Sequence, residues 1–376
     1  MQTNKIIQPP QTIGIIGGGQ LGRMMALAVK YMGYRVMVLD PMPDCPTAQV
    51  ADEHITAAYD DMNGIKTLVA NSNVVTYEFE NVDLEAASYI EETGKLPQGS
   101  EALAITQNRE KEKQLMTSLN LPVPEFAIVH NAEECRGALK TFTFPAVIKT
   151  CSGGYDGKGQ LKLTGPDDTE AAAEFAEKNG HCIIERWLSF DKEISTVFTR
   201  SKNGDIQFFP IAENEHRDHI LYKTTAPAAV SDHVAEKAKA AAKQIAERMN
   251  IVGTFAIEMF VSGEDIHINE MAPRPHNSGH YTIEACNISQ FGQHIRAICG
   301  LPLMNVQLLQ PSVMINVLGD TLKAAETSMT TMPYGFFHLY GKVSVRPKRK
   351  MGHITFIAET QEMLQEQISM LEEAIQ

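Results

Sequence analysis

Short apolar runs alternate with amphipathic stretches over the first third of the chain. The runs lie at residues 12–16, 35–39 and 73–77, and a helical pattern covers residues 21–31. The runs are rich in β-branched and aliphatic residues, and polar residues, proline or glycine bound them, as expected for buried strands. Because strands that alternate with helices form β–α–β units, this pattern predicts a parallel sheet.

A glycine-rich segment between two strands marks the middle of the chain. A polar helical pattern covers residues 108–119, and Asn131 with Glu134 predicts the capping box of a second helix. Strands are predicted at residues 145–149, 160–163 and 182–185. The first two strands flank the glycine-rich segment. This segment is therefore predicted to be a flap over a ligand, unlike a phosphate loop, which leads from a strand into a helix.

The last part of the chain opens with a long helix and a hairpin. Ser231 is a predicted N-cap for a helix that ends at Met249, whose apolar positions recur at helical spacing. Predicted strands at residues 254–260 and 266–270 flank Gly263. These patterns predict an α/β protein of three domains. The expected domains cover residues 1–107, 108–188 and 189–376.

Composition excludes several classes of protein. The 376 residues suit two or three packed domains. With 33 Lys and Arg against 46 Asp and Glu, the net charge of −13 makes nucleic acid or a membrane surface a poor partner. The six cysteines form no CxxC motif, the N-terminus lacks a signal-peptide pattern, and no apolar run approaches the roughly 20 residues of a membrane span. We therefore expect a cytoplasmic protein with reduced thiols.

A glycine motif follows the first predicted strand. Residues 17–22 (GGGQLG) match the GxGxxG pattern of dinucleotide-binding turns, and Asp40 follows at the end of the next strand. The motif by itself reports a tight turn and an exposed helix N-terminus, which attracts any phosphate. A nicotinamide cofactor therefore remains an alternative at this point.

The second glycine-rich segment carries a sharper signal. Residues 152–159 (SGGYDGKG) follow Lys149 at the end of a predicted strand. Four glycines let backbone N–H groups approach phosphate oxygens, and Lys149 supplies a fixed positive charge. The segment therefore predicts a triphosphate site, with a flexible surface hairpin as the alternative.

Two acidic residues on the predicted hairpin suggest a metal site. If the hairpin is centred on Glu264, Glu258 and Glu270 face each other and point to one side of the sheet. Directly opposed carboxylates repel, so a bound cation is the natural compensation, and magnesium prefers such oxygen ligands. An even-length turn would break this pairing and leave two exposed acids.

Two further segments suit anions. Residues 273–280 (PRPHNSGH) place Arg, His, Asn and Ser side chains between prolines and glycine. A zinc site at His276 and His280 lacks a clear third ligand. Residues 346–350 (RPKRK) form the densest basic cluster, which predicts a phosphate pocket in an acidic chain or else a solvated basic loop.

These motifs, in this order, resemble the ATP-grasp superfamily and, within it, the N5-carboxyaminoimidazole ribonucleotide synthetase family of purine biosynthesis. The similar stretches are residues 13–24 (IGIIGGGQLGRM), 76–82 (TYEFENV), 149–160 (KTCSGGYDGKGQ), 213–216 (ENEH), 268–286 (INEMAPRPHNSGHYTIEAC) and 340–355 (YGKVSVRPKRKMGHIT). The resemblance spans nearly the whole chain. It implies an ATP-grasp fold, with a Rossmann-like N-terminal domain followed by two domains that clasp ATP.

The resemblance also implies a set of site residues. ATP would be bound by Arg109, Lys149, Gly153, Gly154, Tyr155, Asp156, Gly157, Lys158, Gly159, Glu185, Arg186, Trp187, Leu188, Glu193, His216, Asn269 and Glu270. The ribonucleotide would be bound by Gln20, Glu78, Tyr155, Asp156, Arg274, His276, Asn277, Ser278, Lys342, Arg349 and Lys350. Magnesium or manganese would be bound by Glu258 and Glu270, and catalysis would involve Lys149, Tyr155, Asp156 and Arg274.

The implied reaction joins bicarbonate to 5-aminoimidazole ribonucleotide at the expense of ATP, through carboxyphosphate, in a homodimer. Alternatives are another ATP-grasp ligase, of the formate-dependent glycinamide ribonucleotide or biotin carboxylase type, an NAD(P)-dependent oxidoreductase, or a non-catalytic nucleotide-binding module. The chain departs from the expected pattern at Ser344, where an acid is expected, and at Lys348 and His219, where glycine is expected.

Overall fold

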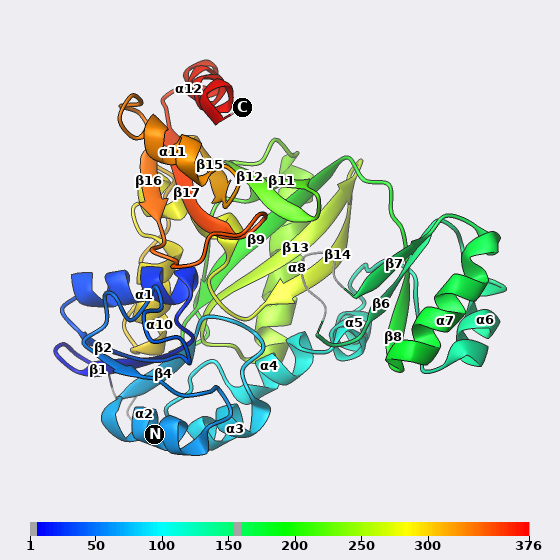
Figure 1. The fold of residues 1–376 in the computed structure, drawn as a ribbon, viewed down its shortest axis with the longest axis horizontal. Helices are drawn as coiled ribbons and strands as arrows, with labels where there is room; N and C mark the ends of the chain where they lie inside the picture. Colours follow the sequence, from blue (N-terminus) through cyan, green and yellow to red (C-terminus); the bar gives the residue numbers. More distant parts are fainter. Residues whose placement is uncertain (1–5, 154–158, 376) are drawn as a thin grey trace.

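The computed structural model describes residues 6–153 and 159–375, which form three β-sheets (Figure 1). The first sheet is parallel, in the order β3-β2-β1-β4. Its strands are β1 (Thr12–Ile16), β2 (Arg35–Leu39), β3 (Glu53–Ile55) and β4 (Val74–Tyr77). The parallel sheet predicted from the alternating apolar runs is confirmed. The short strand β3 at its edge has no apolar run and was not predicted.

Helices cover both faces of the first sheet. The helices are α1 (Gln20–Tyr31), α2 (Met62–Asn71), α3 (Leu84–Glu92), α4 (Ser100–Thr106) and α10 (Gln290–Ile298). Apolar residues of α1 and α10 pack on one face, while α2 and α3 pack on the other with Leu103 of α4 (Figure 1). Helix α10 comes from the last third of the chain, so it ties the N-terminal sheet to the rest of the molecule.

The second sheet is antiparallel, in the order β5-β8-β6-β7, and lies at the right of Figure 1. Its elements are β5 (Phe126–Val129), α6 (Ala132–Leu139), β6 (Ala146–Thr150), β7 (Gln160–Leu163), a 3-10 turn (Pro166–Asp168), α7 (Thr169–Asn179) and β8 (Cys182–Arg186). The predicted capping box of α6 is half formed. Asn131 accepts a hydrogen bond from the Glu134 N–H, but the Glu134 carboxylate accepts from the His130 backbone N–H and the Asn131 side-chain amide instead of from the Asn131 backbone N–H.

The third sheet has nine strands among the described residues, in the order β14-β13-β9-β11-β12-β15-β17-β16, with β10 beside β9. The strands are β9 (Lys192–Arg200), β10 (Ile206–Phe208), β11 (Ala212–Arg217), β12 (Ile220–Ala226), β13 (Gly253–Ser262), β14 (Asp265–Ala272), β15 (Ser312–Leu318), β16 (Phe336–Leu339) and β17 (Lys350–Ile357). The accompanying helices are α8 (Asp232–Met249), a 3-10 turn (Asn277–Gly279), α9 (Thr282–Ala285), α11 (Leu322–Ser328) and α12 (Gln361–Ile375). The expected division into three domains stays a prediction.

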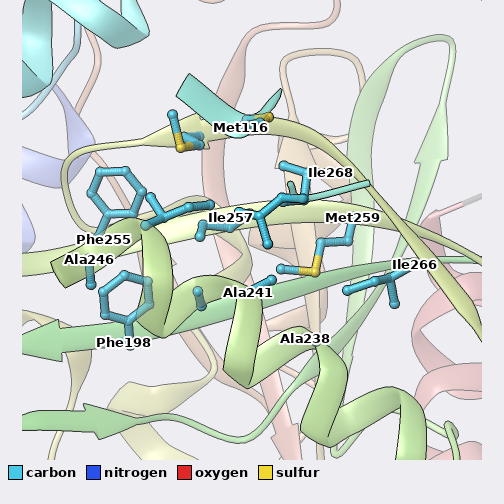
Figure 2. Close-up of a cluster of buried hydrophobic side chains, with 14 of the residues drawn as sticks. Met116, Phe198, Ala238, Ala241, Ala246, Phe255, Ile257, Met259, Ile266 and Ile268 are labelled. Atoms are coloured by element: carbon cyan, nitrogen blue, oxygen red, sulfur yellow. The ribbon is translucent and has the colours of Figure 1, made fainter. Parts of the chain in front are cut away.

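A large apolar cluster anchors this sheet (Figure 2). Ser231 caps α8 as predicted, and the buried face of this helix packs on β9, β13 and β14. Helix α5 (Arg109–Ser118), capped by Asn108, contributes Met116 to the same cluster. Helix α5 thus belongs to the core of the third sheet, while its N-terminus reaches toward the second sheet (Figure 1).

The hairpin β13–β14 contains a β-bulge. The turn has two residues, because Ser262 pairs with Asp265, and this even-length register would place Glu258 opposite Asn269. A register shift beyond Met259 inserts one extra residue in β14, so that Glu258 pairs with Glu270 after all. The predicted pairing is therefore confirmed, whereas the predicted centre of the hairpin at Glu264 is wrong.

The bulge also changes which side Glu270 faces. Ile266 and Ile268 point into the apolar core, and regular alternation would send Glu270 there as well. After the bulge, Met271 takes the core position and Glu270 faces the opposite side with Glu258. Glu270 follows Ile266 and Ile268 at the same spacing of two residues, and the bulge keeps its carboxylate out of the apolar core.

Candidate active site

A cleft of about 710 Å³ lies where the second sheet approaches the third sheet. The described residues that line it include sixteen of the predicted site residues. These are Arg109, Lys149, Gly159, Glu185, Arg186, Trp187, Leu188, Glu193, His216, Glu258, Asn269, Glu270, Arg274, His276, Asn277 and Lys350. Residues from distant parts of the sequence therefore converge as predicted.

One wall of the cleft is formed by charged side chains of the second sheet. The Lys149 ammonium lies 2.6 Å from Glu185 Oε2, and Lys113 Nζ lies 2.9 Å from the other carboxylate oxygen. Burial opposes ionisation of Glu185, but the two lysines outweigh it and hold the pKa of this carboxyl well below its ordinary value. Glu185 is thus an ionised, buried carboxylate between two cations, and Lys149 faces the cleft.

The opposed carboxylates of the bulged hairpin form the facing wall. Burial, together with the nearby Glu270 carboxylate, raises the pKa of Glu258. Arg109 Nη1 lies 3.7 Å from Glu270 Oε2. Among the described residues no group of three or more His, Cys, Asp or Glu side chains could hold a metal ion. Two opposed carboxylates suit magnesium, which takes few protein ligands when phosphates complete its shell.

A second ion pair joins β9 and β11. His216 Nδ1 lies 2.6 Å from Glu193 Oε2. Burial disfavours the charged imidazole, but the partner carboxylate overcomes this and raises the pKa of His216. The pair presents a fixed acceptor and donor to the cleft, as recognition of a sugar hydroxyl requires.

The cleft has an apolar end. Phe190 and Phe260 stack with ring centroids 4.5 Å apart, and both line the cleft with Trp187 and Leu188. The same four residues border an adjoining pocket of about 280 Å³. Flat aromatic and aliphatic side chains beside charged walls suit a purine base.

The loop after β14 aims cationic and imidazole groups at the cleft. Arg274 donates from Nε to Glu80 Oε2 at 2.6 Å, and its Nη2 lies at the same distance. His276 Nε2 lies 3.6 Å from Glu258 Oε1. The Gln290 side chain accepts from His276 N–H and donates to His276 C=O, which fixes the loop backbone. Arg274 is thus held in one orientation by a single carboxylate oxygen, Glu80 Oε2, which contacts two nitrogens of its guanidinium.

Six predicted residues that the structure describes do not line the cleft. They are Gln20, Glu78, Gly153, Ser278, Lys342 and Arg349. Arg349 Nη1 donates to Ser344 C=O at 2.7 Å, and Lys342 Nζ donates to Lys350 C=O at 2.6 Å. These two cations therefore brace the basic segment, while Lys350 itself reaches the cleft. The predicted residues Gly154, Tyr155, Asp156, Gly157 and Lys158 lie outside the described residues.

The N-terminus of α1 is already occupied by acidic side chains. The buried Glu78 carboxylate accepts hydrogen bonds from the N–H groups of Gly19 and Gly22. Asp40 accepts from Gly18 N–H at 2.7 Å. Carboxylates thus satisfy the N–H groups that would bind a dinucleotide pyrophosphate. The geometry disfavours the nicotinamide alternative.

Two departures from the expected pattern have a conformational signature. His219 and Lys348 have φ angles of 65° and 63°, in the left-handed region where glycine is favoured. Lys348 Nζ lies 3.0 Å from Asp218 Oδ2, so the two strained turns contact each other. The third departure, Ser344, accepts hydrogen bonds from Arg349 through its hydroxyl and its carbonyl.

Comparison with known proteins identifies the family. The ribonucleotide synthetase preATP-grasp domain matches residues 10–107, the ATP-grasp domain matches residues 114–291, and the phosphoribosylaminoimidazole carboxylase C-terminal domain matches residues 312–367. An N5-carboxyaminoimidazole ribonucleotide synthase from Bacillus subtilis is 47% identical over 361 residues, which cover 96% of this chain and 95% of the relative. The chain belongs to the N5-carboxyaminoimidazole ribonucleotide synthase family.

Solved structures of this family agree with the fold. An N5-carboxyaminoimidazole synthetase from Staphylococcus aureus, complexed with ADP, superposes with a TM-score of 0.93 at 41% identity and 98% coverage of both chains. An N5-carboxyaminoimidazole synthase from Aspergillus clavatus, in complex with ADP and 5-aminoimidazole ribonucleotide, gives a TM-score of 0.89 at 31% identity, covering 97% of this chain and 98% of that chain. The predicted ATP-grasp fold is confirmed.

Several charged residues of the site escaped prediction from the sequence. Glu80 lines the cleft and orients Arg274. Lys113 and Glu112 lie behind the cleft wall, at 1% and 2% exposure. Their signal was present in part, because both sit on the apolar face of the predicted helix 108–119, where an uncompensated charge is unexpected.

Proposed function

We propose that the chain carboxylates 5-aminoimidazole ribonucleotide with bicarbonate and ATP, giving N5-carboxyaminoimidazole ribonucleotide, ADP and phosphate. Membership of the family supports the reaction. The observation that carries the proposal is the cleft itself, which combines an apolar end, cations at Arg109 and Lys149, and opposed carboxylates at Glu258 and Glu270. That combination suits a purine nucleotide whose phosphates are bound with a divalent cation.

The charged residues have separable roles in this proposal. Lys149 and Arg109 would neutralise charge that develops as the γ-phosphoryl group passes to bicarbonate. The product of that step, carboxyphosphate, is a reactive mixed anhydride that the weakly nucleophilic aminoimidazole amine can attack, directly or through released carbon dioxide. Arg274, held by Glu80, and Lys350 would orient the ribonucleotide phosphate or the carboxylate being transferred.

Glu258 and Glu270 are the proposed ligands of magnesium or manganese. The direct pairing of Glu258 with Glu270, and the pKa of Glu258 raised by burial and by the Glu270 carboxylate, support a hard divalent cation as the ligand of this donor set. Bound there, the ion would supply charge neutralisation to the phosphates. We assign the exclusion of water to the glycine-rich segment 152–159, in line with its predicted role as a flap.

A phosphate-release assay tests the proposal. Phosphate release should require ATP, bicarbonate and 5-aminoimidazole ribonucleotide together, and N5-carboxyaminoimidazole ribonucleotide should accumulate. Matched reactions replace the ribonucleotide with glycinamide ribonucleotide and formate, or with biotin. Turnover with either replacement, and none with 5-aminoimidazole ribonucleotide, would contradict the proposal and favour another ATP-grasp ligase.

We also propose a cytoplasmic homodimer. All six cysteines are free and buried, which suits a reducing compartment. None of the described helices has both the length and the apolar character needed to cross a membrane. Sedimentation of the purified protein at micromolar concentration should give about twice the mass of 41.5 kDa, and a single-chain mass would contradict the dimer.

A further inference from the structure

Helix α5 carries a buried lysine that does not itself line the cleft. Lys113 is 1% exposed and lies on the face of α5 that also buries Leu115 and Met116 in the apolar core. An ammonium group out of contact with water is costly unless acceptors surround it. The acceptors that contact the Lys113 ammonium therefore indicate the role of this residue.

Lys113 contacts both sides of the cleft. Its ammonium lies 2.9 Å from Glu185 Oε1 on β8 of the second sheet, and it donates to the C=O groups of Asn269 at 2.9 Å and Ile268 at 3.4 Å on β14 of the third sheet. Three acceptors match the three N–H bonds of an ammonium group. Asn269 is the extra residue of the β-bulge, so Lys113 also satisfies a carbonyl at the irregular point of the ladder.

Glu185 links Lys113 to a cleft residue. Its other carboxylate oxygen lies 2.6 Å from Lys149 Nζ. Of the two lysines, Lys149 lines the cleft and has 18% of its side chain exposed, whereas Lys113 is enclosed. A nucleotide phosphate that attracts Lys149 must therefore compete with Glu185 for the same cation.

We propose that Lys113 is a positioning residue of the ATP site, acting as the permanent counter-ion of Glu185 so that Lys149 can transfer to the phosphates of ATP. This inference rests on the proposed function. With Lys113 present, departure of Lys149 leaves Glu185 still paired. Without Lys113, Lys149 is the remaining ion-pair partner of Glu185 among the described residues, and a buried carboxylate that loses its ion-pair partner is strongly destabilised.

Calorimetric titration with magnesium and the non-hydrolysable β,γ-imido analogue of ATP tests this role. Lys113→Met keeps the length of the side chain and removes its charge, and we expect the dissociation constant to rise at least tenfold. Lys111→Met, on the exposed side of the same helix, is the matched control and should stay within twofold of the wild type. Equal affinity of Lys113→Met and the wild type would overturn the proposal.

A second substitution separates positioning from packing. If Glu185 keeps Lys149 away from the phosphates in Lys113→Met, adding Glu185→Gln should free Lys149. The double variant should then bind the ATP analogue at least threefold more tightly than Lys113→Met. A double variant that binds no better than Lys113→Met would assign the loss to disturbed packing of α5 and overturn the proposal.

Two further outcomes are a Lys113→Met variant that fails to fold and a wild type that binds nucleotide without turnover. If Lys113→Met does not fold, the double variant is compared with Glu185→Gln alone. Because a neutral residue 185 no longer needs a counter-ion, affinities within threefold of each other support the proposal and a larger loss in the double variant overturns it. If the wild type binds the ATP analogue but shows no phosphate release with 5-aminoimidazole ribonucleotide, the proposed function fails while the inference about Lys113 stands on the binding data.

Discussion

Substitution of Glu112 by Gln should make the protein less sensitive to pH. Glu112 is 2% exposed, and its Oε1 accepts the Met271 N–H at 2.7 Å. Burial raises the pKa of this carboxyl to about 8, although the nearby Lys113 and Arg109 oppose the shift. At neutral pH the folded protein therefore holds Glu112 mainly as a neutral acid, which glutamine resembles in shape and charge.

The size of the effect follows from linkage. A carboxyl whose pKa is higher in the folded than in the unfolded state stabilises the fold at low pH. This stabilisation is lost as pH rises from the ordinary value toward about 8. Each pH unit in that window costs about 1.4 kcal/mol of unfolding free energy. Between pH 6 and pH 8 the wild type should lose about 2 kcal/mol through Glu112, and the loss should level off above pH 8.

Urea unfolding without nucleotide or metal, followed by circular dichroism at pH 6, 7, 8 and 9, measures this difference. Glu112→Gln keeps the acceptor for Met271 N–H and does not titrate, so its stability relative to that of the wild type should rise by about 2 kcal/mol between pH 6 and pH 8. Glu236→Gln, which removes an exposed carboxylate of α8, is the control and should track the wild type. A Glu112→Gln curve parallel to that of the wild type would show that Glu112 is ionised in the fold and refute the reasoning.

Three other predictions follow from the site. Glu270→Gln should lower the rate of phosphate release by about a hundredfold or more while leaving the circular dichroism spectrum unchanged, because it removes charge stabilisation in the transition state; near-normal turnover would exclude Glu270 from the metal site. Gly18→Ala places a Cβ 2.2 Å from Cys45 Sγ and 2.8 Å from Asp40 Cγ, so thermal unfolding should reveal a loss of about 1–3 kcal/mol, and an unchanged melting temperature would contradict that packing. Magnesium-ATP should raise the melting temperature and NAD should not, since Asp40 and Glu78 occupy the N-terminus of α1; a shift with NAD alone would reverse the assignment.

Local patterns predicted the elements that local forces determine. The strand at residues 12–16, the capped helix before Met249 and the two strands around the glycine-rich segment all follow from periodicity and turn residues, and the structure contains them. The resemblance supplied the set of cleft residues that no local pattern could bring together. Sixteen of those residues line one cleft, although their individual roles stay predictions.

The residues that sequence reasoning missed are those whose meaning depends on distant partners. Glu80 is informative only beside Arg274, which lies 194 positions later, and Lys113 only beside Glu185 and Asn269. The GGGQLG turn was ambiguous for the same reason, because Glu78 fills the helix N-terminus from another strand. Buried ion pairs between separate segments leave no periodic trace in a single sequence.

The bulge in β14 has a consequence for how many polar groups one strand can present to a ligand. In a regular strand, consecutive side chains point to opposite faces, so neighbouring residues cannot both serve one site. Asn269 and Glu270 are consecutive, yet both line the cleft. If Asn269 were deleted, Glu270 would directly follow Ile268 and would still pair with Glu258 on the cleft side of a regular strand. The extra residue is therefore not required for the pairing of the two carboxylates. Its effect is to double the local density of ligand-facing groups on a strand that elsewhere alternates.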